Sequence, residues 1–236
     1  MKIDIWSDIM CPFCYIGKRK LEGALVQFEH KEDVQIVWHS FQLDPTIAYE
    51  PGKDLYTYLA ERKGATREWS VMVHNQMTET AKKEGLTYNF DKAVIANSFD
   101  AHRLIQLAKK HGLGGAAEEA LFKAYFTDGR DISDHNTLMQ IGIETGLRVV
   151  EIGEMLNSDA YAADVKNDLR QAQELGINGV PFFVFDNKYA ISGAQPVAVF
   201  RDGLQQAWAE YEKGNTVINE QGDICTPGGV CEPTKK

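Results

Sequence analysis

The chain has 236 residues, of which 44% are hydrophobic, so it is long and apolar enough to bury a core as one domain or as one domain carrying an insertion. Its formal charge of -9, with no lysine–arginine cluster and no aromatic–basic stripe, disfavours nucleic acid and anionic membranes as partners. No secretory-signal pattern is visible before the first expected strand, and no apolar stretch approaches the roughly 18 to 20 residues that span a bilayer. We therefore expect a soluble, cytoplasmic protein.

The first predicted strand leads into a cysteine motif. The segment Lys2-Ile3-Asp4-Ile5-Trp6 alternates as a strand does, Cys11-Pro12-Phe13-Cys14 follows it, and a helical pattern then runs to about His30. One face of that helix is formed by Cys14, Gly17, Leu21, Leu25 and Phe28. The two thiols are thus one helical turn apart, with Cys11 where the unpaired N–H groups and positive dipole end of the helix stabilise a thiolate. Cys11 is the candidate nucleophile.

A long helical stretch separates the second predicted strand from the third. The second strand covers 34–38, and strand patterns then vanish until Phe182. Helices are predicted near 55–62, 68–84, 93–111, 116–126, 136–145 and 150–157. The glycines expected as left-handed caps at their ends are Gly64, Gly85, Gly112, Gly129 and Gly146. This part of the chain is therefore predicted to be a helical insertion.

The remaining elements return to a mixed pattern. Asp159 offers an N-cap for a helix that ends near Gly176, and Val180-Pro181 precedes the apolar run 182–185. Asp186-Asn187 separates that run from 188–192, which predicts a hairpin. Pro196 begins a final helix whose apolar face holds Val197, Phe200, Leu204, Trp208 and Tyr211. Beyond Gly214 the chain is polar and loop-like, with five residues between Cys225 and Cys231.

A Cys-x-x-Cys between the first strand and the first helix, with a Val-Pro before a later hairpin, is typical of the thioredoxin fold. Because a helical block separates the two halves, the chain resembles the DsbA-like thiol oxidoreductases. The segments 8–17, 179–185 and 191–195 look like the cytoplasmic FrnE-like branch, and the resemblance extends from residue 1 to about 212. It implies an α/β, thioredoxin-like fold with a large all-helical insertion. The expected parts are a discontinuous thioredoxin-like domain (1–46 and 158–212), the insertion (47–157) and a tail (213–236) with the second cysteine pair.

The resemblance also implies roles for individual residues. Cys11 would attack a disulfide and Cys14 would resolve the mixed disulfide. The Val180–Pro181 bond would be cis and face Cys11, which leaves the Val180 backbone free to pair with an extended substrate. Cys225 and Cys231 match the additional C-terminal cysteine pair of FrnE-like proteins, where they would be an auxiliary redox pair. The alternative is a passive disulfide or two idle thiols.

Three further side chains are open to two interpretations. His102 lies in a segment that the branch places near its active cleft, where it could orient substrate or supply a proton near neutral pH. Alternatively, His102 and Arg103 satisfy polar partners where the insertion packs on the thioredoxin half. Asp4 is either the buried acid that assists proton transfer in thioredoxin-like proteins or a solvent-facing strand residue, and its spacing from Cys11 is one residue off the usual one.

The leading functional hypothesis is a cytoplasmic dithiol–disulfide oxidoreductase acting on protein or small-molecule thiols. It needs no metal and no organic cofactor beyond its own thiols, and glutathione is compatible as a co-substrate. A second hypothesis is a glutathione-dependent isomerase or transferase of the chromene-carboxylate isomerase type, against which Cys14 argues because those enzymes normally carry a single reactive Ser or Cys. A third is a metal-binding or chaperone-like module, although Cys225 and Cys231 are a poor match to a compact four-thiolate zinc site.

Overall fold

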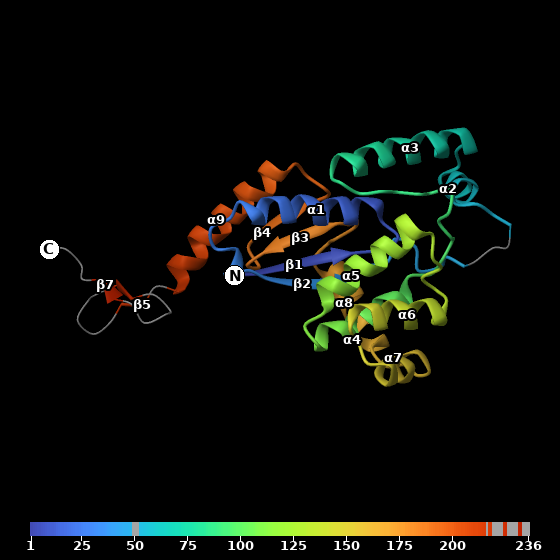
Figure 1. Ribbon diagram of the computed structural model, residues 1–236. Coiled ribbons are helices and arrows are strands. Elements are labelled where there is room, and N and C mark those ends of the chain that lie inside the picture. Colours follow the sequence, from blue (N-terminus) through green and yellow to red (C-terminus); the bar gives the residue numbers. More distant parts are fainter. Residues whose placement is uncertain (49–51, 216, 219–223, 226–230, 233–236) are drawn as a thin grey trace.

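The computed structural model describes residues 1–48, 52–215, 217–218, 224–225 and 231–232. At its centre is a four-stranded mixed sheet in the order β2-β1-β3-β4 (Figure 1). The strands are β1 (Lys2–Ser7), β2 (Gln35–Ser40), β3 (Phe182–Phe185) and β4 (Tyr189–Ser192), of which only β1 and β2 are parallel among the described pairs. The register pairs Ile5 with Trp38 on one side and with Phe183 on the other. Strand β1 therefore joins the two halves of the chain.

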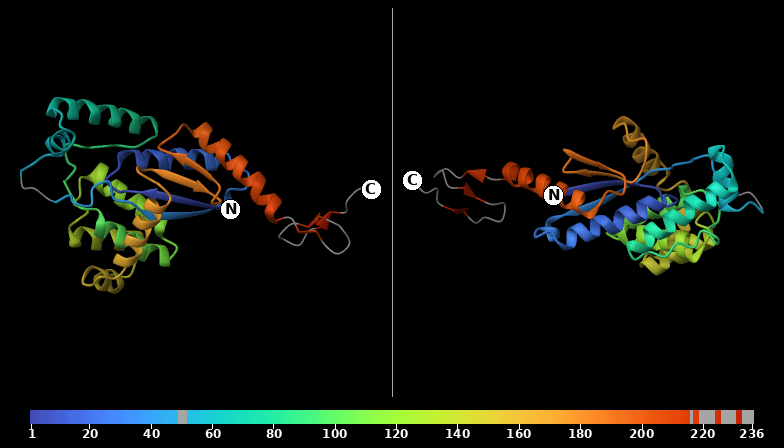
Figure 2. Two further views of the ribbon diagram at one scale, coloured as in Figure 1. Left: turned by 180° about the vertical axis from the view of Figure 1, so that it is seen from behind. Right: turned by 90° about the horizontal axis from the view of Figure 1, so that it is seen from above.

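Helices cover both faces of this sheet (Figure 2). On one face lie α1 (Pro12–Val26) and α9 (Val197–Asn215), where Phe183 of β3 meets Phe200 of α9 edge-on with ring centroids 4.8 Å apart. On the other lies α8 (Ala162–Glu174), whose Ala172 joins Trp6 of β1 in a separate apolar cluster. Because side chains alternate along a strand, Ile3, Ile5 and Ser7 face α1, whereas Asp4 and Trp6 face α8.

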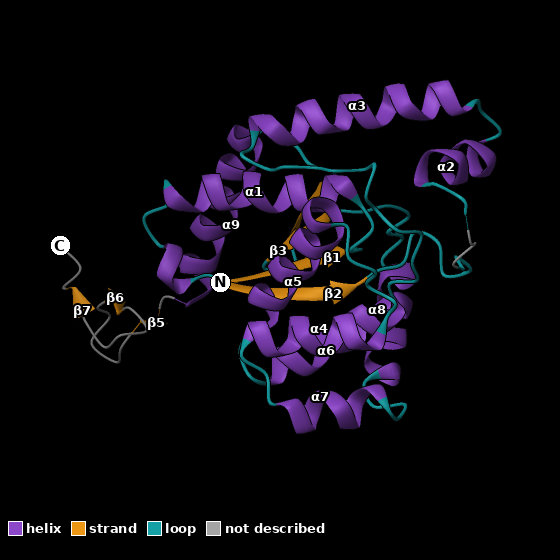
Figure 3. Cartoon of the chain, turned by 45° about the vertical axis from the view of Figure 1, so that its right-hand side comes forward, coloured by secondary structure: helices purple, strands orange, loops and turns teal. Residues whose placement is uncertain are grey.

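The insertion forms two groups of helices (Figure 3). One is the pair α2 (Leu55–Lys63) and α3 (Arg67–Lys83), and the other contains α4 (Phe99–Lys110), α5 (Gly114–Phe122), α6 (His135–Thr145) and α7 (Val149–Leu156). Phe122, Tyr125 and Phe126 are buried where α5 ends. Together with the sheet, these elements confirm the predicted α/β, thioredoxin-like fold with a large helical insertion. The glycines predicted to cap the helix ends all have positive φ.

Helix α4 begins later than the spacing predicted, at Phe99 rather than near residue 93. The Asn97 side chain explains the boundary, because its Oδ1 accepts a hydrogen bond from the Phe99 N–H at 2.9 Å and its Nδ2 donates to the Ile47 carbonyl at 3.1 Å. Helix α8 also begins later, at Ala162, so Asp159 is not its N-cap. The residue before it, Tyr161, has a φ of 64° and interrupts the helical path.

Elsewhere too, the observed secondary structure differs from the helix or loop that the sequence pattern predicts. The regular helix predicted to Phe126 ends at Phe122 and continues as a π-helix, η2 (Lys123–Asp128), and a short 3-10 helix, η1 (Lys31–Asp33), precedes β2. The tail was predicted to be loop, but its described residues form three strands of two residues each: β5 (Val217–Ile218), β6 (Ile224–Cys225) and β7 (Cys231–Glu232). Short apolar pairs in a polar context give too weak a signal for strand prediction.

Under the sheet, His39 lies between two carboxylates. Its Nε2 is 2.7 Å from Asp4 Oδ1, and its Nδ1 is 3.0 Å from Asp168 Oδ1 of α8. Burial opposes a charge on His39, but the hydrogen bonds to Asp168 and Asp4 outweigh that effect and raise its pKa. Burial likewise opposes ionisation of both carboxyls, whose pKa values His39 nevertheless lowers. The cluster is a buried, charged connection between β1, β2 and α8.

This cluster makes stability depend on pH. The folded-state pKa of His39 lies above its unfolded value of about 6.5, so its contribution is complete below that pH and is lost as pH rises through the folded-state pKa. The carboxylates act oppositely, since their contribution is complete above about pH 4 and is lost as pH falls through their folded-state pKa values. We expect His39→Gln to flatten the alkaline side of a plot of urea midpoint against pH.

The matched control for this measurement is His135→Gln, because the side chain of His135 is 51% exposed. The control should leave the shape of the plot unchanged. An alkaline slope that persists in His39→Gln would contradict the assignment.

Candidate active site

The cysteine motif lies where β1 leads into α1, and Asp8 fixes that turn. The Asp8 carboxylate accepts hydrogen bonds from the Met10 N–H at 3.2 Å and the Leu43 N–H at 2.7 Å, and its carbonyl accepts one from the Cys11 N–H at 2.9 Å. Pro12 begins the helix, where its missing N–H costs no hydrogen bond. The sequence analysis did not single out Asp8, and an aspartate just after a strand gives no local signal of such a role.

The two cysteines occupy different environments. Cys11 is the N-cap of α1, and its carbonyl accepts a hydrogen bond from the Cys14 N–H at 3.0 Å. Cys11 is 4% exposed and Cys14 is 1% exposed, and both are free thiols. Burial raises the pKa of Cys14 well above its ordinary value, and the neighbouring Cys11 adds to this, whereas the Asp8 backbone and the Ser7 hydroxyl oppose it. Cys11 is thus the more accessible of the two thiols, and burial disfavours ionisation of Cys14.

The loop before β3 faces Cys11. The Val180–Pro181 peptide bond is cis, and the Cys11 Sγ lies 3.4 Å from the Val180 carbonyl oxygen that accepts its hydrogen bond. Pro181 also packs against α1 at Gly17, where a Cβ atom would be only 2.9 Å from the Pro181 Cγ. The fold therefore brings Cys11, Val180 and Pro181 together, although they lie at opposite ends of the thioredoxin-like half.

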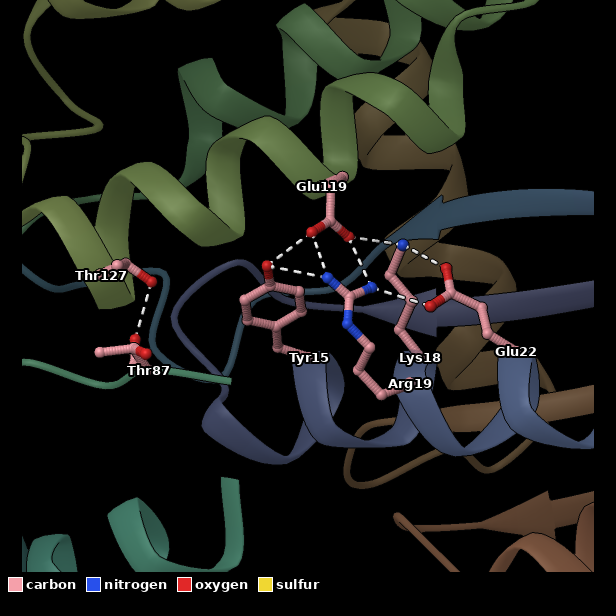
Figure 4. Close-up of polar contacts among 7 residues, drawn as sticks. All are labelled: Tyr15, Lys18, Arg19, Glu22, Thr87, Glu119 and Thr127. Atoms are coloured by element: carbon pink, nitrogen blue, oxygen red, sulfur yellow. Dashed lines mark hydrogen bonds and ion pairs between the residues drawn. The ribbon is translucent and has the colours of Figure 1, made fainter. Parts of the chain in front are cut away.

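Polar contacts from the insertion hold α1 in place (Figure 4). Glu119 of α5 accepts a hydrogen bond from the Tyr15 hydroxyl at 2.6 Å and forms ion pairs with Lys18, at 2.6 Å, and with Arg19. Burial opposes ionisation of Glu119, but Arg19, Lys18 and Tyr15 hold its pKa at about 2. The insertion also reaches the motif itself, because the Tyr88 hydroxyl donates to the Pro12 carbonyl at 2.6 Å.

Another hydrogen bond lies within the insertion. The Thr127 hydroxyl donates a hydrogen bond to the Thr87 carbonyl at 2.7 Å (Figure 4). It joins the end of η2 to the segment that carries Tyr88, and so helps to fix the side chain that contacts the cysteine motif.

A cavity of about 460 Å³ opens beside the motif, with Met10 and Pro12, the two neighbours of Cys11, in its wall. Most of its lining is apolar and comes from Leu43, Ile47, Leu55, Leu59, Met77, Phe90 and Phe126, and its polar members include Asp44, Arg62 and Lys63. A larger hollow of about 600 Å³ is lined by α3 alone and contains none of the predicted site residues. Of these two cavities, the one beside Met10 is the one lined by residues that flank Cys11 in the sequence.

His102 and Arg103 lie next to each other on α4 but have different surroundings. Arg103 donates to the Ala160 carbonyl at 2.8 Å and pairs with Asp100 at 2.7 Å, as the structural interpretation of this residue expects. His102 is 1% exposed, its Nε2 lies 3.5 Å from Asp8 Oδ1, and neither ring nitrogen has a hydrogen-bond partner among the described residues. His102 is thus behind the motif and closed off from solvent.

Asp4 is buried, so the solvent-facing interpretation was wrong. It faces α8 and not the cysteines, and its carboxylate is engaged by His39 and by Lys2 at 2.9 Å. Besides Asp8, a second buried acid near the end of β1 is Glu118 of α5, which is 1% exposed. Sequence analysis missed it, although a signal was present. Glu118 falls on the same helical face as Ala117, Leu121 and Phe122, where a charged residue at a core position is unusual.

The second cysteine pair is described only through its backbone. Cys225 of β6 and Cys231 of β7 are opposite each other in an antiparallel pair. Their side chains and residues 226–230 lie outside the described residues. Their role as an auxiliary redox pair therefore stays a prediction.

Within the described ranges, no helix has the length and apolar character needed to cross a membrane. In the same part of the chain, no group of three or more His, Cys, Asp or Glu side chains is arranged to hold a metal ion.

A Cys-x-x-Cys pair at the N-terminus of the first helix, in contact with a Val-Pro loop at the end of a mixed sheet, defines a thioredoxin-like thiol protein. More specifically, the chain belongs to the DsbA-like thioredoxin-domain family, because residues 2–205 match the family described as the DSBA-like thioredoxin domain. The chain is also 26% identical over 204 residues to the "uncharacterized protein YwbO" of Bacillus subtilis (strain 168), an alignment that covers 86% of this chain and 94% of that protein.

Solved structures agree with this assignment. The probable DsbA oxidoreductase SCO1869 from Streptomyces coelicolor matches over 100% of both chains, with 37% identity and a TM-score of 0.85. The cytosolic disulfide reductase DsbM from Pseudomonas aeruginosa, solved with GSH, matches 89% of this chain and 100% of its own, with 19% identity and a TM-score of 0.62. A 2-hydroxychromene-2-carboxylate isomerase matches 90% and 98%, with 13% identity and a TM-score of 0.66. At such identities the last two show the fold alone.

Proposed function

We propose that this protein is a cytoplasmic dithiol–disulfide oxidoreductase of the FrnE-like branch, whose Cys11-Pro12-Phe13-Cys14 centre exchanges disulfides with protein or small-molecule thiols. The observation that carries the proposal is the position of the Cys11 thiol, 3.4 Å from the Val180 carbonyl and next to the more buried Cys14. In this arrangement Cys11 can attack a substrate disulfide beside the Val180 backbone, and the more buried Cys14 can then resolve the mixed disulfide.

The reaction has two steps. The Cys11 thiolate attacks one sulfur of a substrate disulfide, which forms a mixed disulfide and releases the first substrate thiolate. Cys14 then attacks the Cys11 sulfur, which closes the internal disulfide and releases the second substrate thiolate. The reverse sequence oxidises a substrate dithiol. The cavity beside Met10 and Pro12 would receive the apolar groups that flank the substrate sulfur, and glutathione is a candidate co-substrate for recycling the centre.

The test is insulin reduction and refolding of a reduced substrate, each measured with the wild type, Cys11→Ser, Cys14→Ser and Cys225→Ser. Cys11→Ser should be inactive in both assays, because it lacks the attacking thiolate. Cys14→Ser should stop at a mixed disulfide, visible as the added mass of one substrate thiol. A partial loss in Cys225→Ser would support the auxiliary redox pair. A wild type that is inactive in both directions would refute the oxidoreductase proposal.

The second candidate is a glutathione-dependent isomerase of the chromene-carboxylate isomerase type, and the mostly apolar cavity beside Met10 and Pro12, the sequence neighbours of Cys11, is the observation that favours it. The two candidates differ in their need for Cys14. Isomerisation requires one reactive group, so an isomerase would keep its turnover in Cys14→Ser, whereas an oxidoreductase would lose it. Assaying that variant in the presence of glutathione separates the two candidates.

A further inference from the structure

Two buried side chains in the wall of the cavity beside Met10 each carry a polar atom without a hydrogen-bond partner among the described residues. They are His74 of α3 and Tyr125 of η2, which are 4% and 1% exposed. Polar groups this deeply buried almost always have a partner. A binding cavity is typically lined by apolar side chains with a few polar groups that orient the ligand. The two side chains therefore point to a ligand that supplies their partners.

Contacts on α3 fix which nitrogen of His74 is open. Its Nδ1 lies 2.8 Å from the Ser70 carbonyl oxygen, which only accepts hydrogen bonds, so Nδ1 carries the proton. The ring is held edge-on against Tyr56 and Phe90, with centroids 5.0 and 4.6 Å away. Burial lowers the pKa of His74, which keeps the ring neutral at pH 7. Its Nε2 is then an acceptor, and it is not among the fully enclosed unpaired atoms, so the cavity reaches it.

Tyr125 supplies the complementary group. It lies in the π-helix η2, a form that is rare in proteins and frequent at functional sites. Its ring meets Phe126 edge-on at 4.9 Å, and both residues line the cavity. Burial and the nearby Asp8 raise the pKa of Tyr125, so its hydroxyl keeps the proton. The hydroxyl is also absent from the enclosed unpaired atoms, which makes it a donor open to the cavity.

The carboxylates in the cavity wall already have partners. Asp8 accepts hydrogen bonds from two backbone N–H groups, and Asp44 is paired with Arg62. Lys63, the other charged residue of the lining, is exposed. A charged group brought into this space would lose its water without a buried charge to replace it. The cavity therefore suits an uncharged group with an apolar body.

We propose that this cavity is a specificity pocket for a phenol ring, namely the side chain of a tyrosine near the reactive cysteine of a protein substrate. The inference rests on the proposed oxidoreductase function. A phenolic hydroxyl donates one proton and accepts through its oxygen, so it can satisfy both the His74 acceptor and the Tyr125 donor. An aliphatic or phenylalanine side chain leaves both atoms unpaired, and an unpaired buried polar atom lowers affinity.

The walls of the cavity fit the rest of the ring and place it on the substrate. Phe90 and Phe126 offer aromatic faces and edges for offset or edge-on packing. Met10 and Pro12 line the same cavity and flank Cys11 in the sequence. We therefore assign the ring to a residue one or two positions from the substrate cysteine.

The experiment uses disulfide-linked peptide dimers in pairs that differ by one hydroxyl. Each pair has tyrosine or phenylalanine one or two positions before or after the cysteine. The fully reduced protein is mixed with each dimer, and oxidation of Cys11 and Cys14 is followed by mass spectrometry to give a second-order rate constant. A buried hydrogen bond is typically worth about fivefold in affinity. At one or more positions, the tyrosine peptide should react about fivefold to tenfold faster than its phenylalanine counterpart.

Three variants test the assigned atoms. His74→Asn keeps a donor for the Ser70 carbonyl but removes the acceptor, and Tyr125→Phe removes only the hydroxyl. Each should reduce the preference for tyrosine to about twofold or less by slowing the tyrosine peptide, while the phenylalanine peptide keeps its rate. His74→Gln, whose amide reaches farther toward the position of Nε2, should restore part of the preference. Tyr125→Phe also tests the pocket if His74→Asn does not fold.

The matched control is His111→Asn, because the side chain of His111 is 38% exposed and does not line the cavity. This control should keep the full preference. Equal rates with tyrosine and phenylalanine at every position would refute the pocket while the oxidoreductase function stands. A preference that persists in both His74→Asn and Tyr125→Phe would refute it as well. If the wild type is oxidised by none of the peptides, the proposed function fails and the pocket fails with it.

Discussion

Replacing Asp168 with alanine is expected to lower the free energy of unfolding by about 3–5 kcal/mol, the usual cost of removing one partner of a buried ion pair. Asp168 is 5% exposed, and its carboxylate lies 3.0 Å from the His39 ring, 2.8 Å from the Ser40 N–H and 2.6 Å from the Gln106 amide. Alanine leaves the His39 Nδ1 and the Ser40 N–H without their acceptor, and the Gln106 amide keeps only the Ser40 hydroxyl at 3.1 Å. The midpoint and slope of urea unfolding measure the change.

Two further variants isolate the cause. Asp164→Ala removes an exposed carboxylate from the first turn of the same helix and should cost no more than about 1 kcal/mol. Asp168→Asn keeps an oxygen for Ser40 and Gln106 but removes the charge opposite His39, so an intermediate loss of about 1–3 kcal/mol is expected. Equal effects of Asp168→Ala and Asp164→Ala would show that the buried network does not stabilise the fold.

The Asp168 network also has a consequence for the active site. It ties α8 and α4 to the end of β2, and the Phe41 N–H that follows donates to the Ser7 carbonyl at 2.9 Å. Ser7 is the last residue of β1 before the turn that carries the cysteines. Stability of the sheet and the position of the turn that carries the cysteines are therefore coupled through the same strand ends.

Much of the fold could be predicted from local sequence patterns. Helices α2, α3, α6 and α7 begin and end within two residues of the predicted positions, because apolar periodicity and glycine caps are signals that each segment carries by itself. The start of α4 was missed because Asn97 contacts Ile47, far away in the chain. A boundary set by a long-range contact leaves no mark in the local pattern.

The active site divides in the same way. The spacing of the two cysteines identifies the motif in the sequence. Glu118 has no such signature, because its burial depends on how α5 packs on β1 and α1. Glu118 and Glu119 look like an ordinary pair of surface carboxylates in the sequence. In the structure one is enclosed beside Ser7 and the other is held by Arg19 and Lys18. Tertiary packing alone gives the two neighbours opposite properties.

Replacing Gly17 with alanine is expected to impair both stability and disulfide exchange. The new Cβ would be 2.9 Å from the Pro181 Cγ and 3.2 Å from the Phe183 Cζ, and both rings belong to buried residues. Overpacking costs about 1–3 kcal/mol, against a gain of about 1 kcal/mol in helix propensity. If Pro181 moves, Val180 moves with it away from the Cys11 thiol, and a misplacement of about 1 Å can cost up to 100-fold in rate.

Gly23→Ala in the same helix provides the matched control and is expected to have the opposite sign. Its new Cβ would meet Val197 at 3.6 Å, an ordinary contact, so the helix-propensity gain of about 0.5–1 kcal/mol should appear as increased stability. Exchange with a small disulfide should be unchanged in Gly23→Ala and slower in Gly17→Ala, while urea unfolding shows shifts in opposite directions. Exchange at the wild-type rate in Gly17→Ala would mean that the distance between the Val180 loop and Cys11 does not limit the reaction.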